Sequence, residues 1–122
     1  MNKEFILYEH ALELKELSFD EECGAFYFKD LENIYQKCCE WFVSNDDAYY
    51  YGEEILCVAP LYQQAFRFFR EKYFLGHGIN PYSLDAHLID LEDCIFYDID
   101  DVYTYEEAEL ACLKKLIEIA KK

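Results

Sequence analysis

The sequence predicts an α+β fold, in which one domain spanning residues 1–122 has an antiparallel sheet covered by about three helices. Three observations predict it. Three segments carry apolar residues every three or four positions, which is the period of a helix lying on a core. Segments rich in aromatic and β-branched residues lie between them and favour strands. These strands come in consecutive groups without long crossovers, as in an antiparallel sheet beneath helices.

The C-terminal segment carries the clearest helix signal. Thr104 and Glu107 form the T-x-x-E pattern of a capping box, with Thr104 as the N-cap. The residues at helical spacing that form the apolar stripe are Tyr105, Ala108, Cys112, Leu116 and Ile119. Leu110 and Ile117 fall roughly opposite that stripe, so we expect them to contact another helix or a second copy of the chain.

A second helix is predicted after Pro60, because proline suits the first position of a helix. Its apolar stripe consists of Tyr62, Ala65, Phe66, Phe69 and Tyr73. Phe68 lies on a flank of this helix, and Gly76 and Gly78 end the segment. The first helix is predicted from the spacing of Leu7, Ala11, Leu14 and Leu17.

Residues 25–28 and 54–58 are predicted strands because they are aromatic or β-branched. Residues 82–91 and 94–99 are predicted to form a hairpin with its turn at Glu92 and Asp93. Residues 31–43 fit either a strand or a helix, because a short apolar run matches both periods. Residues 44–52, rich in Asn, Asp and Tyr, are predicted to be a loop.

Composition excludes several classes of protein. The hydrophobic fraction of 53% argues against disorder, and no apolar run is long enough to span a membrane. The N-terminal residues lack the apolar core of a secretory signal, so we expect a cytoplasmic protein. The net charge of −15 opposes direct binding to nucleic acid or to an anionic membrane. It serves solubility or, alternatively, an acidic surface that mimics nucleic acid and binds a basic partner.

The six cysteines of the chain form no C-x-x-C pair. Four of them stand alone in apolar segments, and Cys38 and Cys39 are adjacent without a second close pair. We therefore expect reduced thiols that act as small buried hydrophobes, with structural disulfides or a zinc site as the alternatives.

Three segments together resemble a group of small uncharacterised proteins encoded by phages and mobile elements of gut bacteria. They run from Tyr8 to Leu17, from Ala59 to Tyr73 and from Thr104 to Ile119, so the resemblance covers mainly the predicted helices. This chain departs from the group at Phe68, which is often tryptophan there. The resemblance implies a cytoplasmic accessory protein that acts on host machinery, and it supplies no catalytic residue.

No catalytic, cofactor-binding or metal-binding motif is found. The glycines form no phosphate-binding loop, and no serine stands in G-x-S-x-G. Carboxylates around the predicted hairpin are the best metal candidates because hard cations prefer oxygen ligands. They are Asp90, Glu92, Asp93, Asp98, Asp100, Asp101, Glu106 and Glu107. A small metal-dependent hydrolase that uses this hairpin is therefore an alternative, although the spacing of an EF-hand is absent.

The strongest remaining signal is the aromatic fraction of 19% in a highly acidic chain. Tyrosine is enriched at protein interfaces, although such rings also pack locally over a sheet edge. The residues of the candidate interaction surface are Tyr49, Tyr50, Tyr51, Phe68, Leu110 and Ile117. We expect a non-enzymatic protein-binding accessory protein, without a cofactor, and a homo-oligomer that buries Leu110 and Ile117 is a further hypothesis.

Overall fold

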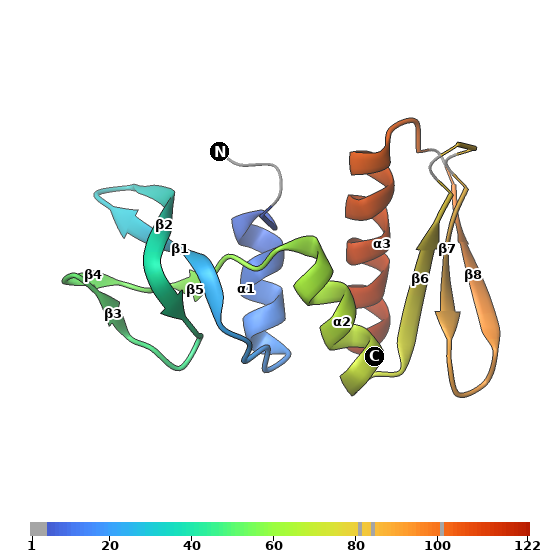
Figure 1. Cartoon of the computed structure of the whole chain (residues 1–122), viewed down its shortest axis with the longest axis horizontal. Helices are drawn as coiled ribbons and strands as arrows, with labels where there is room; N and C mark the ends of the chain where they lie inside the picture. The colour runs from blue at the N-terminus through green and yellow to red at the C-terminus, as the bar shows by residue number, and fades with distance from the viewer. Residues whose placement is uncertain (1–4, 81, 84, 101) are drawn as a thin grey trace. The chain divides into compact units, whose positions relative to one another are not determined.

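The computed structural model describes residues 5–80, 82–83, 85–100 and 102–122 and confirms the α+β class. Its helices are α1 (Tyr8–Glu16), α2 (Tyr62–Lys72) and α3 (Tyr105–Ala120). The strands of the described residues form three small antiparallel sheets rather than the one sheet predicted (Figure 1). The chain divides into two compact units, Met1–Gln64 and Ala65–Lys122, which are described separately below.

In the first unit, β1 (Cys23–Asp30) pairs antiparallel with β2 (Asn33–Val43) and, at its other edge, with β5 (Cys57–Val58). Residues 31–43, which fitted either period, are therefore mainly strand. A separate two-stranded ribbon joins β3 (Tyr49–Tyr50) to β4 (Glu53–Glu54). The predicted loop is thus wrong at β3, because Tyr51 and Gly52 both adopt the positive φ of a tight hairpin turn.

Helix α1 covers one face of the β2-β1-β5 sheet through Tyr27. The ring of Tyr27 is buried and meets the ring of Tyr8 edge-on, with centroids 5.5 Å apart. Its hydroxyl donates to the backbone carbonyl of Ile6 and accepts from the side-chain amide of Gln36. Burial raises the pKa of Tyr27, since the ionised form would lose its hydration. The bond to Ile6 thus ties the chain that precedes α1 to the sheet, and the bond from Gln36 on β2 holds the hydroxyl in place.

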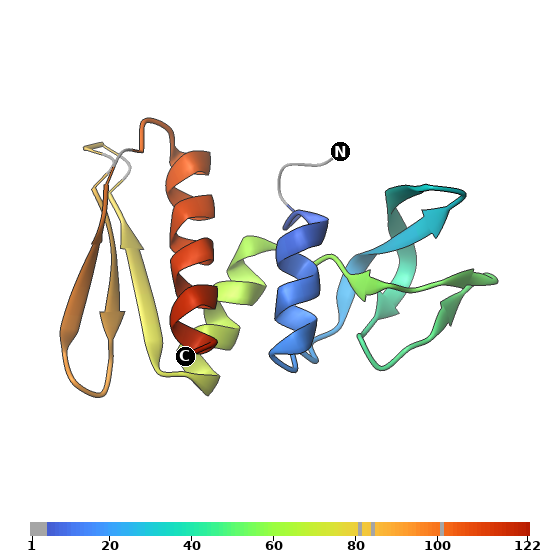
Figure 2. The same cartoon turned by 180° about the vertical axis from the view of Figure 1, so that it is seen from behind.

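In the second unit, the sheet has the order β6-β7-β8, with β6 (Leu75–Ile79), β7 (Ala86–Asp90) and β8 (Ile95–Ile99). The predicted hairpin is confirmed, because β7 pairs antiparallel with β8. Helix α3 contacts all three strands and lies along one face of the sheet (Figures 1 and 2). Ala108, Cys112 and Leu116 of the predicted stripe are buried, whereas Tyr105 is exposed at the first turn.

Helix α2 contacts β6 through an aromatic pair. The rings of Phe66 and His77 stack with centroids 3.7 Å apart. Burial lowers the pKa of His77, and the charges of Arg70 and His87 lower it further. The neutral imidazole is therefore the form that the folded unit prefers.

All six cysteines are free. Cys23, Cys57 and Cys112 are buried, and burial raises their pKa values to about 12, about 12 and about 11. The prediction of small buried hydrophobes is confirmed for these three and wrong for Cys38 and Cys94, which are exposed on strand β2 and in the β7–β8 turn. Among the described residues, no helix has the length and apolar character needed to span a bilayer.

The N-cap of α3 can be tested by substitution. Thr104 Oγ1 accepts from the backbone N–H of Glu107 at 3.1 Å, and the Glu107 carboxylate accepts from the N–H of Tyr103 at 3.0 Å. We expect Thr104→Ala to lower the free energy of unfolding by about 1 kcal/mol, because an orphan N–H loses its acceptor. Thr104→Ser is the matched control and should retain most of the stabilisation, because serine keeps the hydroxyl acceptor. Urea denaturation followed by circular dichroism measures both, and equal losses would contradict the capping role.

The neutral state of His77 predicts a dependence of stability on pH. The pKa of His77 in the folded chain lies below its ordinary value of 6.5. The neutral ring therefore makes its full contribution to the free energy of unfolding above about pH 6.5. That contribution falls as the pH drops through 6.5 towards the folded pKa, since only the unfolded chain then takes up the proton. His77→Phe, which keeps a ring on Phe66, should therefore lose less stability than wild type between about pH 7.5 and about pH 5.5. Urea midpoints of wild type and His77→Phe at both pH values measure the two losses, and equal losses would contradict the prediction.

Candidate interaction surface

The three consecutive tyrosines do not form one exposed patch. Tyr50 is only 3% exposed, whereas Tyr49 and Tyr51 are exposed on either side of it in sequence. Successive strand residues point to opposite faces, and Tyr51 has already entered the turn. The prediction that Tyr50 belongs to the interaction surface is therefore wrong, because Tyr50 is a core residue of the first unit.

Tyr50 attaches the β3–β4 ribbon to the sheet. Its ring packs against Phe26 of β1, with centroids 5.3 Å apart, and its hydroxyl accepts from the backbone N–H of Glu40 at 2.8 Å. Phe26 neighbours Tyr27 on β1, so the two side chains point to opposite faces of that sheet. The ribbon thus covers the face opposite to the one that Tyr27 presents to α1.

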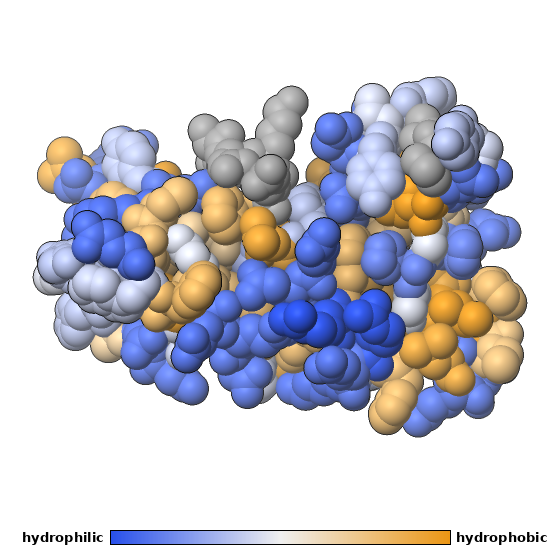
Figure 3. Space-filling view, viewed as in Figure 1, coloured by the Kyte–Doolittle hydropathy of each residue, from blue (hydrophilic) through white to orange (hydrophobic). Residues whose placement is uncertain are grey.

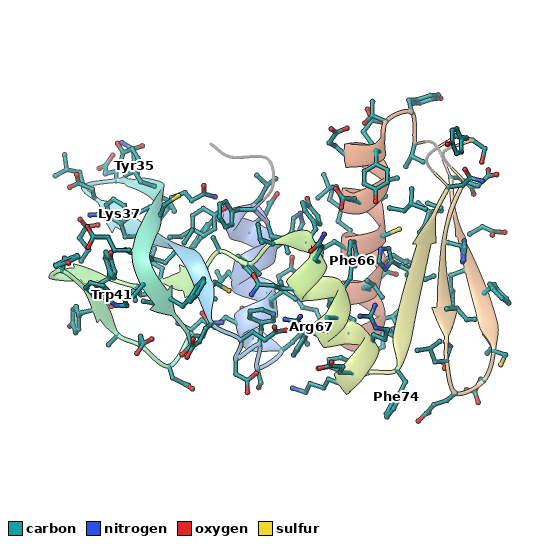
Figure 4. All side chains as sticks on the ribbon, in the orientation of Figure 1. Tyr35, Lys37, Trp41, Phe66, Arg67 and Phe74 are labelled. Atoms are coloured by element: carbon teal, nitrogen blue, oxygen red, sulfur yellow. The ribbon has the colours of Figure 1, made fainter. Side chains whose placement is uncertain are left out.

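Two exposed rings lie on this buried tyrosine. Trp41 is 51% exposed and Tyr51 is 65% exposed, yet their ring centroids lie 4.9 and 4.8 Å from that of Tyr50. Their own centroids are 5.0 Å apart, and the Tyr51 hydroxyl donates to the Glu40 carboxylate at 3.3 Å. Figure 4 labels Trp41 next to β2. We name Trp41 and Tyr51, resting on Tyr50, the aromatic surface.

The surroundings of the aromatic surface are acidic. Lys37 forms an ion pair with Glu53 at 2.7 Å, and this hydrogen bond raises the pKa of Lys37. The same ammonium group lies 6.0 Å from the centroid of the Tyr50 ring. Glu40 and Glu54 are exposed nearby on β2 and β4. Because Glu53 neutralises Lys37, the charge that this region offers to a partner is negative.

A shallow pocket of about 330 Å³ adjoins the β3–β4 turn. Its lining residues come from the end of β1, from that turn and from β4: Phe28, Lys29, Asp30, Gly52, Glu53 and Glu54. Three of them are carboxylates and one is a lysine. Such a pocket suits the cationic end of an arginine or lysine side chain better than an apolar ligand.

The remaining predicted surface residues lie elsewhere. Phe68 is buried beside Phe69 of α2 and Tyr73 just after it, at ring distances of 5.4 and 5.9 Å, and Ile117 is buried on α3. The prediction that Phe68 and Ile117 lie on an interaction surface is therefore wrong. The apolar arc of each helix is wider than the single stripe predicted. Leu110 on α3 is half-buried. All three residues belong to the second unit, whereas the aromatic surface belongs to the first.

The acidic hairpin shows no ion-binding geometry in the described part of the chain. No three His, Cys, Asp or Glu side chains there come together as metal ligands, and Asp101 lies outside the described residues. Burial raises the pKa of the Glu109 carboxyl, aided by the nearby charge of Glu106, and Glu109 stands on α3 rather than on the hairpin. The geometry of these residues therefore offers no support for a metal-dependent hydrolase.

Comparison with known proteins gives no relative on which to draw. No family model matches the chain, and no curated protein or solved structure matches it either. The interpretation of the surface therefore rests on its own geometry.

Sequence reasoning missed Trp41, Glu40 and the ion pair of Lys37 with Glu53. The signal was present in residues 31–43, where Tyr35, Lys37, Cys39 and Trp41 alternate as they would along a strand. The tyrosine cluster was found, but its division into buried and exposed members depends on the turn at Tyr51 and Gly52.

Tyr50 can be tested as the attachment point of the ribbon. Tyr50→Phe removes the acceptor of the Glu40 N–H and should cost about 1 kcal/mol of unfolding free energy. Tyr50→Ala also leaves a cavity beneath two rings and should cost about 3–5 kcal/mol. Trp41, the single tryptophan, reports the difference: its emission should shift to longer wavelength in Tyr50→Ala and stay unchanged in Tyr50→Phe. Unchanged emission in both variants would show that Tyr50 does not support Trp41.

Proposed function

We propose that this chain is a non-enzymatic protein-binding protein whose first unit contacts its partner through the aromatic surface. The observation that carries the proposal is that Trp41 and Tyr51 remain at least half exposed while ring contacts with buried Tyr50 hold them in place. Tryptophan and tyrosine dominate binding hot spots. Rings that are already fixed lose little conformational entropy when a partner covers them.

The charge around the surface defines the partner further. Exposed Glu40 and Glu54, and the carboxylate-lined pocket beside the turn, favour a partner that presents arginine or lysine next to an apolar contact. An arginine suits both features, because its guanidinium stacks on aromatic rings and pairs with carboxylates. The setting we propose is the cytoplasm, with the chain acting as an accessory protein of a phage or mobile element.

The proposal is tested with Trp41→Ala/Tyr51→Ala, and Tyr82→Ala is the matched control because Tyr82 is 97% exposed in the second unit. Tagged wild type and Tyr82→Ala should recover the same stoichiometric partner from host lysate, and the double variant should bind it at least about 10-fold more weakly. Titration of the purified partner into wild type should change the emission of Trp41.

Two results would contradict the proposal. One is the recovery of no stoichiometric partner by wild type at low and moderate salt. The other is a partner that the double variant retains with the affinity of wild type. Circular dichroism of each variant shows that a loss of binding does not come from unfolding.

A further inference from the structure

The β6-β7-β8 sheet of the second unit has one face that α3 covers and one that the described residues leave open. In the strand register, His77, Leu88 and Tyr97 are neighbours on one face, and Gly76, Ile89 and Phe96 are neighbours on the other. Leu88 is fully buried, which places α3 on its face, whereas Phe96 is 63% exposed. We call the face of Gly76, Ile89 and Phe96 the open face.

Apolar residues are neighbours on the open face and at the end of that face next to the β7–β8 turn. Gly76 has no side chain, so Ile89 Cγ2 and a methyl group of Leu91 lie 3.1 and 3.6 Å from where its Cβ would stand. The Leu91 N–H donates to the Phe74 carbonyl at 2.8 Å, and Phe96 is the cross-strand neighbour of Ile89. We name Phe74, Ile89, Leu91 and Phe96 the hairpin patch. Figure 3 shows a hydrophobic area over the β7–β8 hairpin.

Part of each side chain in the hairpin patch remains accessible. Phe74, Leu91 and Phe96 are exposed, and Ile89 is half-buried. Singly exposed apolar residues are ordinary on a protein surface, but a contiguous group rimmed by polar residues marks an interaction site. The second unit therefore carries an apolar surface of its own.

Apart from His87, whose ring lies 5.9 Å from that of Phe96, the ionisable side chains near the hairpin patch on β7, on β8 and in the turn between them are mainly acidic. Between Lys72 and Lys114 the sequence contains no lysine or arginine, but it contains ten acidic residues. Of these, Glu92 and Asp93 are exposed in the turn, and Asp98 is exposed on β8 two residues beyond Phe96. Like charge opposes pairing with a second copy of this chain through the patch. A partner with lysine or arginine beside its apolar residues would be attracted.

The dimensions of the sheet suit one helix. Its five-residue strands are about 16 Å long at about 3.3 Å per residue, the length of roughly eleven helical residues. Helix α3 already shows that the opposite face of this sheet receives a helix. We propose that the open face binds an amphipathic α-helix of another protein, with its apolar side on the hairpin patch and its lysine or arginine side chains beside Glu92, Asp93 and Asp98.

Three synthetic peptides of about 15 residues test this proposal against the full chain. The first has leucines on one helical face and lysines on the other. The second has the same composition in an order that gives no apolar face, and the third replaces lysine by glutamate. Fluorescence anisotropy of labelled peptides should show binding of the first at least about 10-fold tighter than that of the other two. Added salt should weaken binding without abolishing it, since the apolar contact is not screened.

Substitution and labelling locate the site. Leu91→Ser/Phe96→Ser preserves every charge and should weaken binding of the lysine peptide at least about 10-fold. Tyr82→Ser/Tyr103→Ser is the control, because both tyrosines are highly exposed outside the patch, and it should bind as wild type does. If the serine variant fails to fold, the methyl resonance of Ile89 in the wild-type chain gives the same information and should shift when the peptide is added.

Three outcomes would overturn the inference. The first is equal binding of the ordered and disordered lysine peptides, which would mean attraction by charge alone. The second is a peptide footprint that leaves the Ile89 methyl resonance unmoved. The third is a dimer in sedimentation equilibrium that Leu91→Ser/Phe96→Ser dissociates, because a second copy would then be the occupant.

Discussion

A short three-stranded sheet has two faces, and one helix can bury only one of them. This constraint governs both units. In the first, α1 lies on the side of Tyr27. In the second, α3 lies on the side of Leu88. What happens at the second face of each sheet determines which side chains remain available to other molecules.

The two units meet this constraint in different ways. The first folds its own β3–β4 ribbon onto the second face and fixes it with Tyr50, which is buried against Phe26. The ribbon is too small to bury the neighbouring rings as well, so Trp41 and Tyr51 stay at its margin. The second unit has no such ribbon among its described residues. The glycines of β6 let side chains of β7 lie flat on the strand there.

The helices could be predicted because their apolar residues recur with a regular period and because Thr104 marks a start. The β7–β8 hairpin could also be predicted from its turn residues. The division into three sheets could not, because pairing between distant strands leaves no periodic signal within either strand. β5, for example, has only two residues, and its place beside β1 follows from the pairing of Cys57 with Tyr27.

The candidate surface was predictable only in part for the same reason. The identity of Tyr49, Tyr50 and Tyr51 indicated an aromatic cluster, but their burial depends on the turn geometry and on Phe26, which is distant in sequence. Trp41 joins them because β2 is a strand, which the pattern of residues 31–43 left undecided. Phe68 and Ile117 were misplaced because the buried arc of each helix is wider than one stripe of residues at three- and four-residue spacing.

The positions of several lysine side chains determine where the negative charge of the chain is exposed. Lys37 is paired with Glu53, Lys15 donates to the carbonyl of Leu56, and Lys115 and Lys122 both lie near Glu118. These lysines are engaged within the chain, whereas exposed carboxylates border the aromatic surface and the hairpin patch. Exposed ion pairs add little to the free energy of unfolding. Their main effect is that the charge remaining on the surface is negative. A partner that approaches either apolar surface meets negative charge, which selects for basic neighbours and speeds their association.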